Sequence, residues 1–390
     1  MAISSSTINR EPADLRLLRA DQVGSLLRPA KLKETFARHS RGLAGDEELI
    51  IAQNEAIRDV IALQEAHHLP IITDGEFRRH NFMESFADVA GFELWKSRAQ
   101  ASPGLLEGEQ SGTLPAAQER GRDPLPATRR PTTQRLRLVS NRPLDEFRFA
   151  QGLTSTPVKI TLIGPDRISQ RFAYEDSQAV YAGIDEFLAD VIAIERQMIT
   201  ELVQAGCQYV QIDEPGYTAY VDAGSLAEMR SRGEDPIANM ERSIQADNKI
   251  IAGIPGVTFG LHLCRGNRQS YWHREGAYDA IAERLFNSLH HHRFLLEYDT
   301  ERAGGFEPLR FVPKGKVVVL GLITTKTGRL ETVDELKRRV EEATRYIPLD
   351  QLALSPQCGF ASEMAGNLLS EDDQWRKLDI MLETAAQVWG

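Results

Sequence analysis

The chain has 390 residues, of which 42% are hydrophobic and 26% are charged, and its formal net charge is −10. This composition supports a sizeable core and excludes a mainly disordered chain, and the acidic balance argues against a nucleic-acid-binding surface. No apolar run approaches the roughly 18 residues that span a bilayer, and the first residues lack the apolar core of a signal peptide. We therefore expect a cytoplasmic protein that acts on small molecules, without a membrane or nucleic-acid partner.

Short apolar runs rich in β-branched residues alternate with longer amphipathic stretches along the chain. The runs predict strands at residues 15–20, 70–73, 158–163, 209–212, 257–261, 294–296, 317–323 and 352–354. Helical patterns lie between them, for example at 183–205 and 333–346. This alternation predicts an α/β fold with a parallel sheet, and about eight units is the number in a (β/α)8 TIM barrel. The alternative is an open, doubly wound sheet, but the glycine-rich phosphate turn typical of that fold does not follow the first predicted strand.

One segment interrupts the alternation. Residues 96–133 are rich in proline, glycine, serine and charge and have no period. We expect a flexible, lid-like insertion after the second βα unit of a single catalytic domain that spans residues 1–390. The alternative is a disordered insertion with no function.

The chain contains three cysteines, Cys207, Cys264 and Cys358. An odd and sparse set in a reducing compartment is not a disulfide framework, so each thiol is buried and inert, bound to metal or catalytic. Cys207 lies at a predicted junction between a helix and a strand, and we expect it in the core.

Polar residues follow each predicted strand, where barrel enzymes keep their chemistry. In chain order these segments are Asp21–Ser25, Asp74–Glu76, Gly164–Asp166, Asp213–Pro215, His262–Cys264, Glu297–Asp299, Thr324–Lys326 and Ser355–Gly359. The C-terminal ends of parallel strands meet at one end of a barrel, so we expect a histidine, two cysteines and several carboxylates around one basin.

Four of these residues form a candidate zinc site. His262 and Cys264 are two positions apart in a strand and therefore share a face, and Glu297 and Cys358 come from the ends of two other strands at the same barrel mouth. Imidazole, thiolate and carboxylate are tetrahedral zinc ligands at roughly 2.0–2.3 Å. The alternatives are that the thiols act as small hydrophobes and that Glu297 is an ion-pair partner. The run of residues 290–292, three histidines, precedes a strand, and we expect it on the solvated surface.

The motifs at these strand ends resemble those of a known family. They are VGS at 23–25, DGE-x-x-R at 74–79, QIDEP at 211–215, H-x-C-R-G-N at 262–267, LEYD at 296–299 and SPQCG at 355–359. In this order they resemble the cobalamin-independent methionine synthase family, and more narrowly its single-barrel members, which correspond to the C-terminal catalytic half of the full-length enzyme. The resemblance runs from about Arg19 to the C-terminus and skips the insertion.

The resemblance implies a zinc-dependent S-methyltransferase that makes methionine from homocysteine. It implies zinc ligation by His262, Cys264, Glu297 and Cys358. It assigns the homocysteine carboxylate to a Gly-Ser turn, here Gly24 and Ser25, and the amine to acidic residues, here Glu76 and Asp213. We also expect Glu214 to contact substrate and Asp213 to take part in catalysis. Zinc would keep the substrate thiol deprotonated and nucleophilic.

The chain departs from the family pattern where the methyl donor binds. Arg171 lies nearest the position where the full-length enzymes have a tryptophan that stacks on folate, and an arginine is also able to stack on a flat ring. Lys326 stands where they have a histidine that passes a proton to the donor; we expect it to act as that acid or to bind an anionic substrate. The donor stays open among a folate, a methylcorrinoid and another small methyl carrier.

Other functions fit the same motifs. The first is a zinc-dependent thiol alkyltransferase or carbon–sulfur lyase resembling epoxyalkane:coenzyme M transferase, for which a sulfonate-binding arginine among Arg19, Arg28, Arg78 and Arg79 would be needed. The second is a barrel that binds zinc without catalysis. Related barrel decarboxylases lack H-x-C and the late cysteine, which disfavours that class. The sequence leaves the oligomeric state open.

Overall fold

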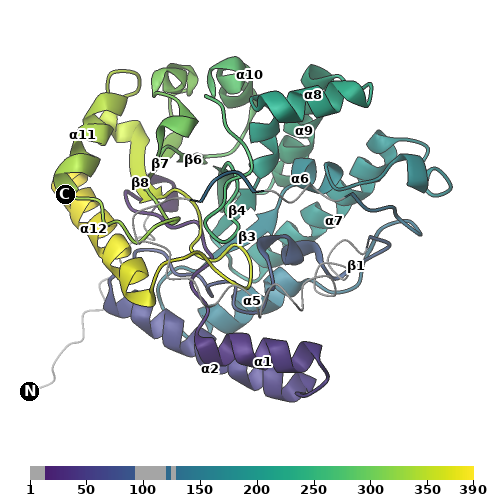
Figure 1. The fold of residues 1–390 in the computed structure, drawn as a ribbon, viewed down its shortest axis with the longest axis horizontal. Helices are drawn as coiled ribbons and strands as arrows, with labels where there is room; N and C mark the ends of the chain where they lie inside the picture. Colours follow the sequence, from purple (N-terminus) through teal and green to yellow (C-terminus); the bar gives the residue numbers. More distant parts are fainter. Residues whose placement is uncertain (1–13, 93–119, 124–128) are drawn as a thin grey trace, which may run out of the picture.

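The computed structural model describes residues 14–92, 120–123 and 129–390 (Figure 1). Most of the predicted insertion at 96–133 lies outside these residues. Within the described ranges, no helix combines the length and the apolar character needed to cross a membrane.

Six parallel strands form the central sheet, each hydrogen-bonded to the next in chain order. They are β3 (Lys159–Ile163), β4 (Tyr209–Asp213), β5 (Thr258–Leu263), β6 (Arg293–Glu297), β7 (Val317–Ile323) and β8 (Leu352–Pro356). Every residue in them is buried. Burial on both faces explains why these strands read as continuous apolar runs. The last six predicted strands are confirmed.

Two shorter segments continue the sheet beyond both of its edges. Ala20 forms a parallel bridge with Leu354 of β8, and Ile72 forms one with the residue before β3. The two added segments contact each other, because the Thr73 hydroxyl donates a hydrogen bond to the Gly24 carbonyl at 2.7 Å. Eight segments therefore follow one another around a ring in chain order, which is the arrangement of a (β/α)8 barrel.

The first two predicted strands are shorter than expected. Residues 15–17 form a 3-10 helix, η1 (Leu15–Leu17), which begins where the Asp14 side chain accepts the Arg16 backbone N–H at 3.1 Å. The predicted strand is wrong for these residues, because the aspartate offers the backbone a local partner in place of a strand neighbour. Of the predicted strand at 70–73, only Ile72 pairs with the sheet.

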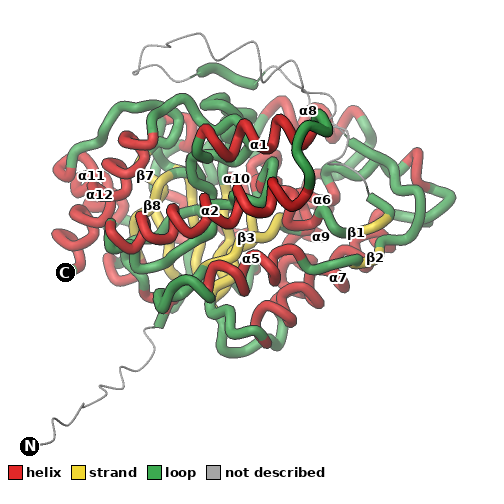
Figure 2. Tube along the Cα trace, turned by 90° about the horizontal axis from the view of Figure 1, so that it is seen from below, coloured by secondary structure: helices red, strands yellow, loops and turns green. Residues whose placement is uncertain are grey.

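Helices follow the strands and cover the outside of the sheet (Figures 1 and 2). They are α1 (Ala30–Ser40), α2 (Asp46–Ala66), α5 (Arg142–Gln151), α6 (Pro165–Ser169), α7 (Ile184–Gln204), α8 (Ala223–Ser231), α9 (Pro236–Ile251), α10 (Asp279–Ser288), α11 (Val333–Ala343) and α12 (Glu371–Trp389). Short 3-10 helices are η2 (Phe82–Phe86), η3 (Glu175–Ser177), η4 (Pro215–Tyr220), η5 (Glu301–Ala303), η6 (Glu307–Phe311) and η7 (Leu349–Gln351). The helical patterns at 183–205 and 333–346 are confirmed as α7 and α11.

A small antiparallel pair, β1 (Val89–Ala90) and β2 (Arg137–Leu138), flanks the predicted insertion. The described residues inside the insertion contact the barrel. Arg122 forms a bridge with Trp272, beyond β5, and Arg130 forms one with Phe172, beyond β3. These residues therefore lie at the C-terminal ends of the strands.

The prediction that residues 290–292 lie on the solvated surface is wrong in part. His291 is completely buried, and burial lowers its pKa to about 3. His292 is half-buried, and its ring stacks on Phe259. Side chains in a strand alternate between two faces, and this alternation extends to the residues just before β6. His291 therefore shares a face with Arg293, which is buried at the start of β6.

Candidate active site

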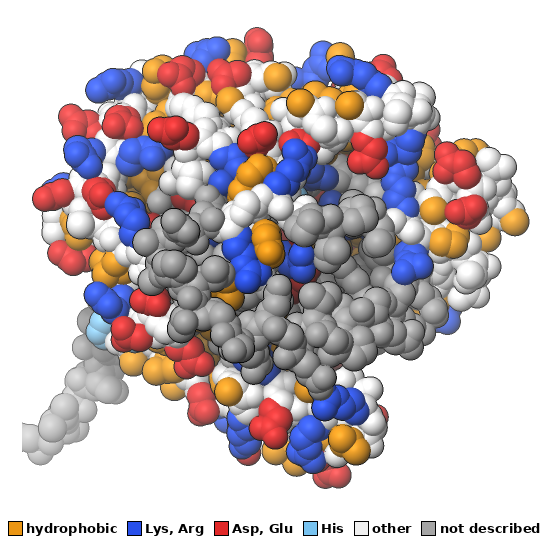
Figure 3. Space-filling model, in the orientation of Figure 1, with side chains coloured by type: hydrophobic (Ala, Val, Ile, Leu, Met, Phe, Trp, Pro, Cys, Tyr) orange, Lys and Arg blue, Asp and Glu red, His pale blue; other side chains and the backbone are white. Residues whose placement is uncertain are grey.

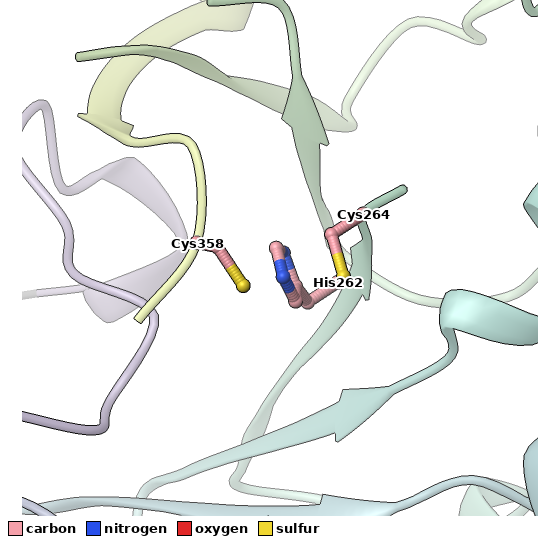
Figure 4. Close-up of side chains that lie close together, drawn as sticks. All are labelled: His262, Cys264 and Cys358. Carbon is pink, nitrogen blue, oxygen red and sulfur yellow. The ribbon is translucent and has the colours of Figure 1, made fainter. Parts of the chain in front are cut away.

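Three side chains from two strand ends form a candidate metal site. His262 lies near the end of β5, and Cys264 follows that strand directly on the same face. Cys358 lies two residues beyond β8. One ring nitrogen and the two sulfurs lie within 4.8 Å of one another, and all three residues are buried (Figure 4). The structure thus brings together three of the four predicted ligands.

One ligand atom in this group has no protein partner. His262 Nδ1 lies 3.2 Å from the carbonyl oxygen of Leu295, so Nδ1 carries the hydrogen and Nε2 carries the lone pair. Nε2 is buried without a hydrogen-bond partner. A buried acceptor is costly unless a ligand occupies it, and an imidazole nitrogen with two thiols is a donor set that suits zinc. The three residues therefore fit a zinc ion.

The electrostatics of the group favour a thiolate. The pKa of the Cys264 thiol lies well below its usual value, chiefly because Cys358 hydrogen-bonds to its sulfur; burial opposes this shift, and the nearby His262 imidazole adds to it. Burial by itself lowers the pKa of His262, but the neighbouring Cys264 raises it overall. Cys264 is therefore poised to be a thiolate, which is the form in which cysteine binds a divalent cation.

Glu297, the fourth predicted ligand, lies at the end of β6 outside this group of three. One of its oxygens accepts the backbone N–H of Arg265 at 2.5 Å, and the other lies 3.1 Å from the guanidinium of Arg302. Burial raises its pKa, but the positive charges of Lys326 and the two arginines lower it below the usual value. The glutamate is therefore ionised, and arginine pairing, the alternative noted for it, is present.

A cavity of about 60 Å³ opens beside the candidate metal site. It lies at the C-terminal ends of the strands. Its lining consists of Val23, Ser25, Glu76, Phe82, Met83, Arg167, Arg171, Asp213, Pro215, His262, Cys264, Gly266, Asn267, Arg268, His273, Cys358, Ser362 and Glu363. Four predicted substrate contacts are among them, namely Ser25, Glu76, Asp213 and Arg171.

Two buried carboxylates line the cavity. Glu76 Oε1 accepts a hydrogen bond from the Thr161 hydroxyl at 2.8 Å, whereas Oε2 is buried without a partner. Glu76 also has a φ of 59°, a strained conformation for a residue with a side chain. Burial and then Glu76 raise the pKa of Asp213 to about 7, although His262 lowers it. A cation placed between these carboxylates would reduce their mutual repulsion. A cationic donor such as an ammonium would also supply the hydrogen bond that Glu76 Oε2 lacks.

The Gly-Ser turn packs against the loop that carries Cys358. Gly24 has a φ of 146°, and a Cβ there would lie 2.8 Å from Thr161 Cγ2, so only glycine fits. The backbone carbonyl of Ser25 accepts the Phe360 N–H at 2.8 Å. A Cβ on Gly359 would lie 2.0 Å from the Ser25 hydroxyl oxygen. Gly24 itself does not line the cavity, but it allows Ser25 to do so.

Glu214 is not brought to the cavity, although we predicted a substrate contact for it. Its carboxylate accepts the backbone N–H groups of Asp166 at 2.7 Å and Arg167 at 3.0 Å, and thus stabilises the start of α6. Successive strand residues point to opposite faces, so Glu214 points outward toward the helices when Asp213 points inward.

Lys326 is buried and does not line the cavity. Its ammonium lies 3.4 Å from Asn267 Oδ1. Its charge lowers the pKa of Glu297 and acts in the same direction on the Cys358 thiol. Lys326 thus lies close enough to the candidate metal site to act on its charges, but outside the cavity lining.

Several cavity residues in the loop after β5 were not predicted from the sequence. Asn267 donates to the Gly359 carbonyl at 2.6 Å, which ties this loop to the Cys358 loop. Arg268 makes two hydrogen bonds of 2.6 Å with Asp123, which lies in the predicted insertion. The R-G-N sequence directly after Cys264 was the available signal for this loop, but the pairing with Asp123 depends on tertiary structure.

The four arginines considered for a sulfonate do not line the cavity. Arg28 donates to four backbone carbonyls, and Arg79 pairs with Glu146 at 2.6 Å. Arg19 donates to backbone carbonyls near β8, and Arg78 stacks on Phe149. The positive charges of these arginines are used in contacts within the fold.

The chain is similar to several known proteins. Residues 134–385 match the family model described as "Cobalamin-independent synthase, Catalytic domain". The chain is 34% identical to the uncharacterized protein YxjH of Bacillus subtilis, over 95% of this chain and 94% of that protein. It is 25% identical to the methionine synthase of Saccharolobus solfataricus, over 95% of this chain and 94% of that enzyme.

A solved structure shares the fold over nearly the whole chain. It is the putative vitamin-B12-independent methionine synthase of Listeria monocytogenes, at a TM-score of 0.72 and 26% identity. The match covers 96% of this chain and 98% of that structure.

Proposed function

The chain belongs to the cobalamin-independent methionine synthase family, and we propose that it is a zinc-dependent S-methyltransferase that converts homocysteine to methionine. Membership supports a methyltransferase. The metal and the acceptor are our inference from the site. The observation that carries it is the unpartnered Nε2 of His262, which lies with two cysteine sulfurs beside a cavity lined by two carboxylates.

His262, Cys264 and Cys358 would hold the zinc. Zinc in catalytic sites commonly has three protein ligands and one open position. When bound, zinc would supply Lewis acidity that keeps a substrate thiol deprotonated. We also propose Glu297 as an added ligand or as a close negative neighbour, because it ends the adjacent strand and is ionised.

The remaining cavity residues suit the amino-acid part of homocysteine. Glu76 and Asp213 would bind the ammonium by charge-assisted hydrogen bonds, which favours the ionised form of Asp213. Ser25, on the turn that Gly24 permits, would bind the carboxylate. These contacts fix the direction of the thiol, so that an electrophilic methyl group held opposite is attacked in line. Glu76, Asp213 and Ser25 are all buried, so a substrate bound to them would be partly withdrawn from water.

The two carboxylates, Glu76 and Asp213, also favour a thiol that carries an ammonium over a thiol that carries a sulfonate. They attract an ammonium and repel a sulfonate, and the arginines that would reverse this preference bind backbone carbonyls and other side chains. An acceptor of the coenzyme M type is therefore disfavoured in this part of the cavity.

We propose that Lys326 balances charge in place of donating a proton directly to the methyl donor. Its ammonium contacts Asn267 and acts on Glu297 and Cys358, all at the candidate metal site. A buried ammonium near thiolates and a carboxylate lowers the cost of holding several negative groups together.

The test is zinc content together with product formation. Purified protein receives homocysteine and, in separate reactions, methyltetrahydrofolate or methylcobalamin. About one zinc per chain, as a single site requires, and methionine in either reaction would support the proposal. Zinc without methionine would retain the metal site and direct the search to epoxides and other alkyl donors. Protein without zinc under reducing conditions would contradict the ligand assignment.

A further inference from the structure

The two carboxylates of the cavity, Glu76 and Asp213, are each held by a neutral side chain of a strand. Thr161 in β3 and Gln211 in β4 are partners in the sheet register, and each lies two residues before the end of its strand. Both are buried, at 3% and 0% exposure, and neither lines the cavity. Because alternate strand residues share a face, Gln211 lies on the face of Asp213, one layer further from the barrel mouth.

Gln211 donates to Asp213 through an amide whose direction is fixed. The amide oxygen accepts a hydrogen bond from the Lys159 ammonium at 2.8 Å, and an ammonium is a donor only. The amide NH2 group must therefore face away from Lys159. It donates to Asp213 Oδ1 at 2.8 Å and to the Val23 carbonyl at 2.8 Å. This contact uses one oxygen of Asp213, so Oδ2 is available to a ligand.

Thr161 holds Glu76 by the same principle. Its hydroxyl oxygen accepts a hydrogen bond from the Arg79 guanidinium at 2.9 Å, and a guanidinium is also a donor only. The hydroxyl hydrogen is therefore directed to Glu76 Oε1, which lies 2.8 Å away. Arg79 is itself held by Glu146 at 2.6 Å and by the Thr161 carbonyl at 3.0 Å. Glu76 Oε2 has no partner and is available to a ligand.

The described surface around the barrel does not offer a comparable selection by charge. Acidic and basic side chains are interspersed over the described part of the face drawn in Figure 3. Such a mixed surface does not distinguish a thiol with an ammonium group from one without it. The distinction has to come from the buried carboxylates and from the side chains that hold them.

We propose that Thr161 and Gln211 are positioning residues that set the preference for a thiol carrying an ammonium group. Each binds one oxygen of its carboxylate and leaves the second oxygen for the ammonium. Acceptors that are already fixed lose less side-chain freedom when the ligand binds, so they bind a charged donor more tightly than mobile ones. The inference deepens the proposed function and rests on it, because it explains how the amine of the acceptor is selected.

The test compares two thiols that differ only in the amine. The full-length protein is titrated in a calorimeter, with zinc and under reducing conditions, with homocysteine and separately with 4-mercaptobutanoate, which lacks the amine. T161V keeps the shape of threonine without the hydroxyl, and Q211M removes the amide while Asp21 remains a partner of Lys159. Each variant should bind homocysteine at least about fivefold more weakly than wild type, the effect of one hydrogen bond. Each should bind 4-mercaptobutanoate within about twofold of wild type.

Two further variants serve as controls. T161S keeps the hydroxyl and should bind homocysteine within about twofold of wild type. S243A removes a buried hydroxyl that donates to Asp166 at 2.6 Å, and neither of these two residues lines the cavity. S243A should therefore bind both thiols like wild type. If Q211M does not fold, the comparison of T161V with T161S decides.

The outcomes separate this inference from the proposed function. Equal losses of affinity for both thiols in T161V, or unchanged affinity for both, would overturn the positioning role and leave the proposed acceptor in place. Wild type that binds the two thiols equally well would reject the proposed ammonium site and the positioning role together.

Discussion

The two ends of the barrel treat buried charge in opposite ways. At the N-terminal ends of the strands, Asp21 binds Lys159 at 2.8 Å, Arg293 at 3.2 Å and the Tyr209 hydroxyl at 2.7 Å, and all four side chains are fully buried. At the C-terminal ends, His262 Nε2 and Glu76 Oε2 are buried without partners. The first end pairs its buried carboxylate with cations of the same chain and serves the fold, although Arg293 Nε there has no hydrogen-bond partner. The second leaves acceptors open, and a ligand is needed to satisfy them.

The largest expected effect is at the C-terminal ends of the strands. C264S and C358S should each lower zinc affinity by more than about 100-fold, since removing a ligand costs at least as much as removing the groups that support one. Methyl transfer should disappear with the metal. Metal analysis after gel filtration and a methionine assay measure both effects.

Cys207 supplies the control for these variants. It is buried in the core, its thiol donates to the nearby Tyr209 carbonyl at 3.4 Å, and burial raises its pKa to about 12. C207A should lose about 1 kcal/mol of stability and keep its zinc. Loss of zinc in C207A, or full zinc in C264S and C358S, would contradict the division between the two ends.

A substitution at the N-terminal ends of the strands should change the stability of the protein and leave its metal content unchanged. K159M removes one partner from a buried charge network and should lower the free energy of unfolding by about 3–5 kcal/mol. The folded protein should still bind zinc normally. Urea denaturation and metal analysis on the same preparation test this, and a K159M protein that is stable but free of zinc would show that the two ends are not separate.

Asp74 tests how one unpaired acid affects the fold. Burial and then Glu146 raise its pKa from 3.8 to about 7. Between these values the folded state holds a proton that the unfolded state has released, so Asp74 makes the protein less stable as pH rises through this window. D74N removes this dependence. The stability of D74N relative to wild type should therefore rise from pH 4 to pH 7, by up to about 4 kcal/mol, and then level off. A difference that is constant with pH would refute the raised pKa of Asp74 as the cause.

The smallest expected effect is on substrate affinity. E76Q removes one charge from the proposed ammonium site and should raise KM for homocysteine about tenfold, the effect of one charge-assisted hydrogen bond. E214Q is the comparison, because Glu214 binds backbone N–H groups of α6 and lies outside the cavity lining. It should leave KM for homocysteine within about twofold. Similar KM values for E76Q and wild type would remove Glu76 from the ammonium site.

The sequence predicted what depends on local pattern. Strands β3 to β8 are buried apolar runs, and the polar residues at their ends follow from the parallel arrangement, so His262, Cys264 and Cys358 were found together. The segment at 15–17 was misjudged because the Asp14 side chain, a local hydrogen-bond partner, decides its structure. The outward position of Glu214 and the pairing of Asp123 with Arg268 depend on how distant segments meet, which no local pattern encodes.

The most direct test of the account is the number of sulfur ligands on the bound zinc, measured by X-ray absorption before and after homocysteine is added. Two cysteine sulfurs should be present in the purified protein, and a third should appear with homocysteine, because its thiol would take the open position. An unchanged number of sulfur ligands, or zinc held only by nitrogen and oxygen, would contradict the claim that His262, Cys264 and Cys358 hold a zinc ion that binds the substrate thiol.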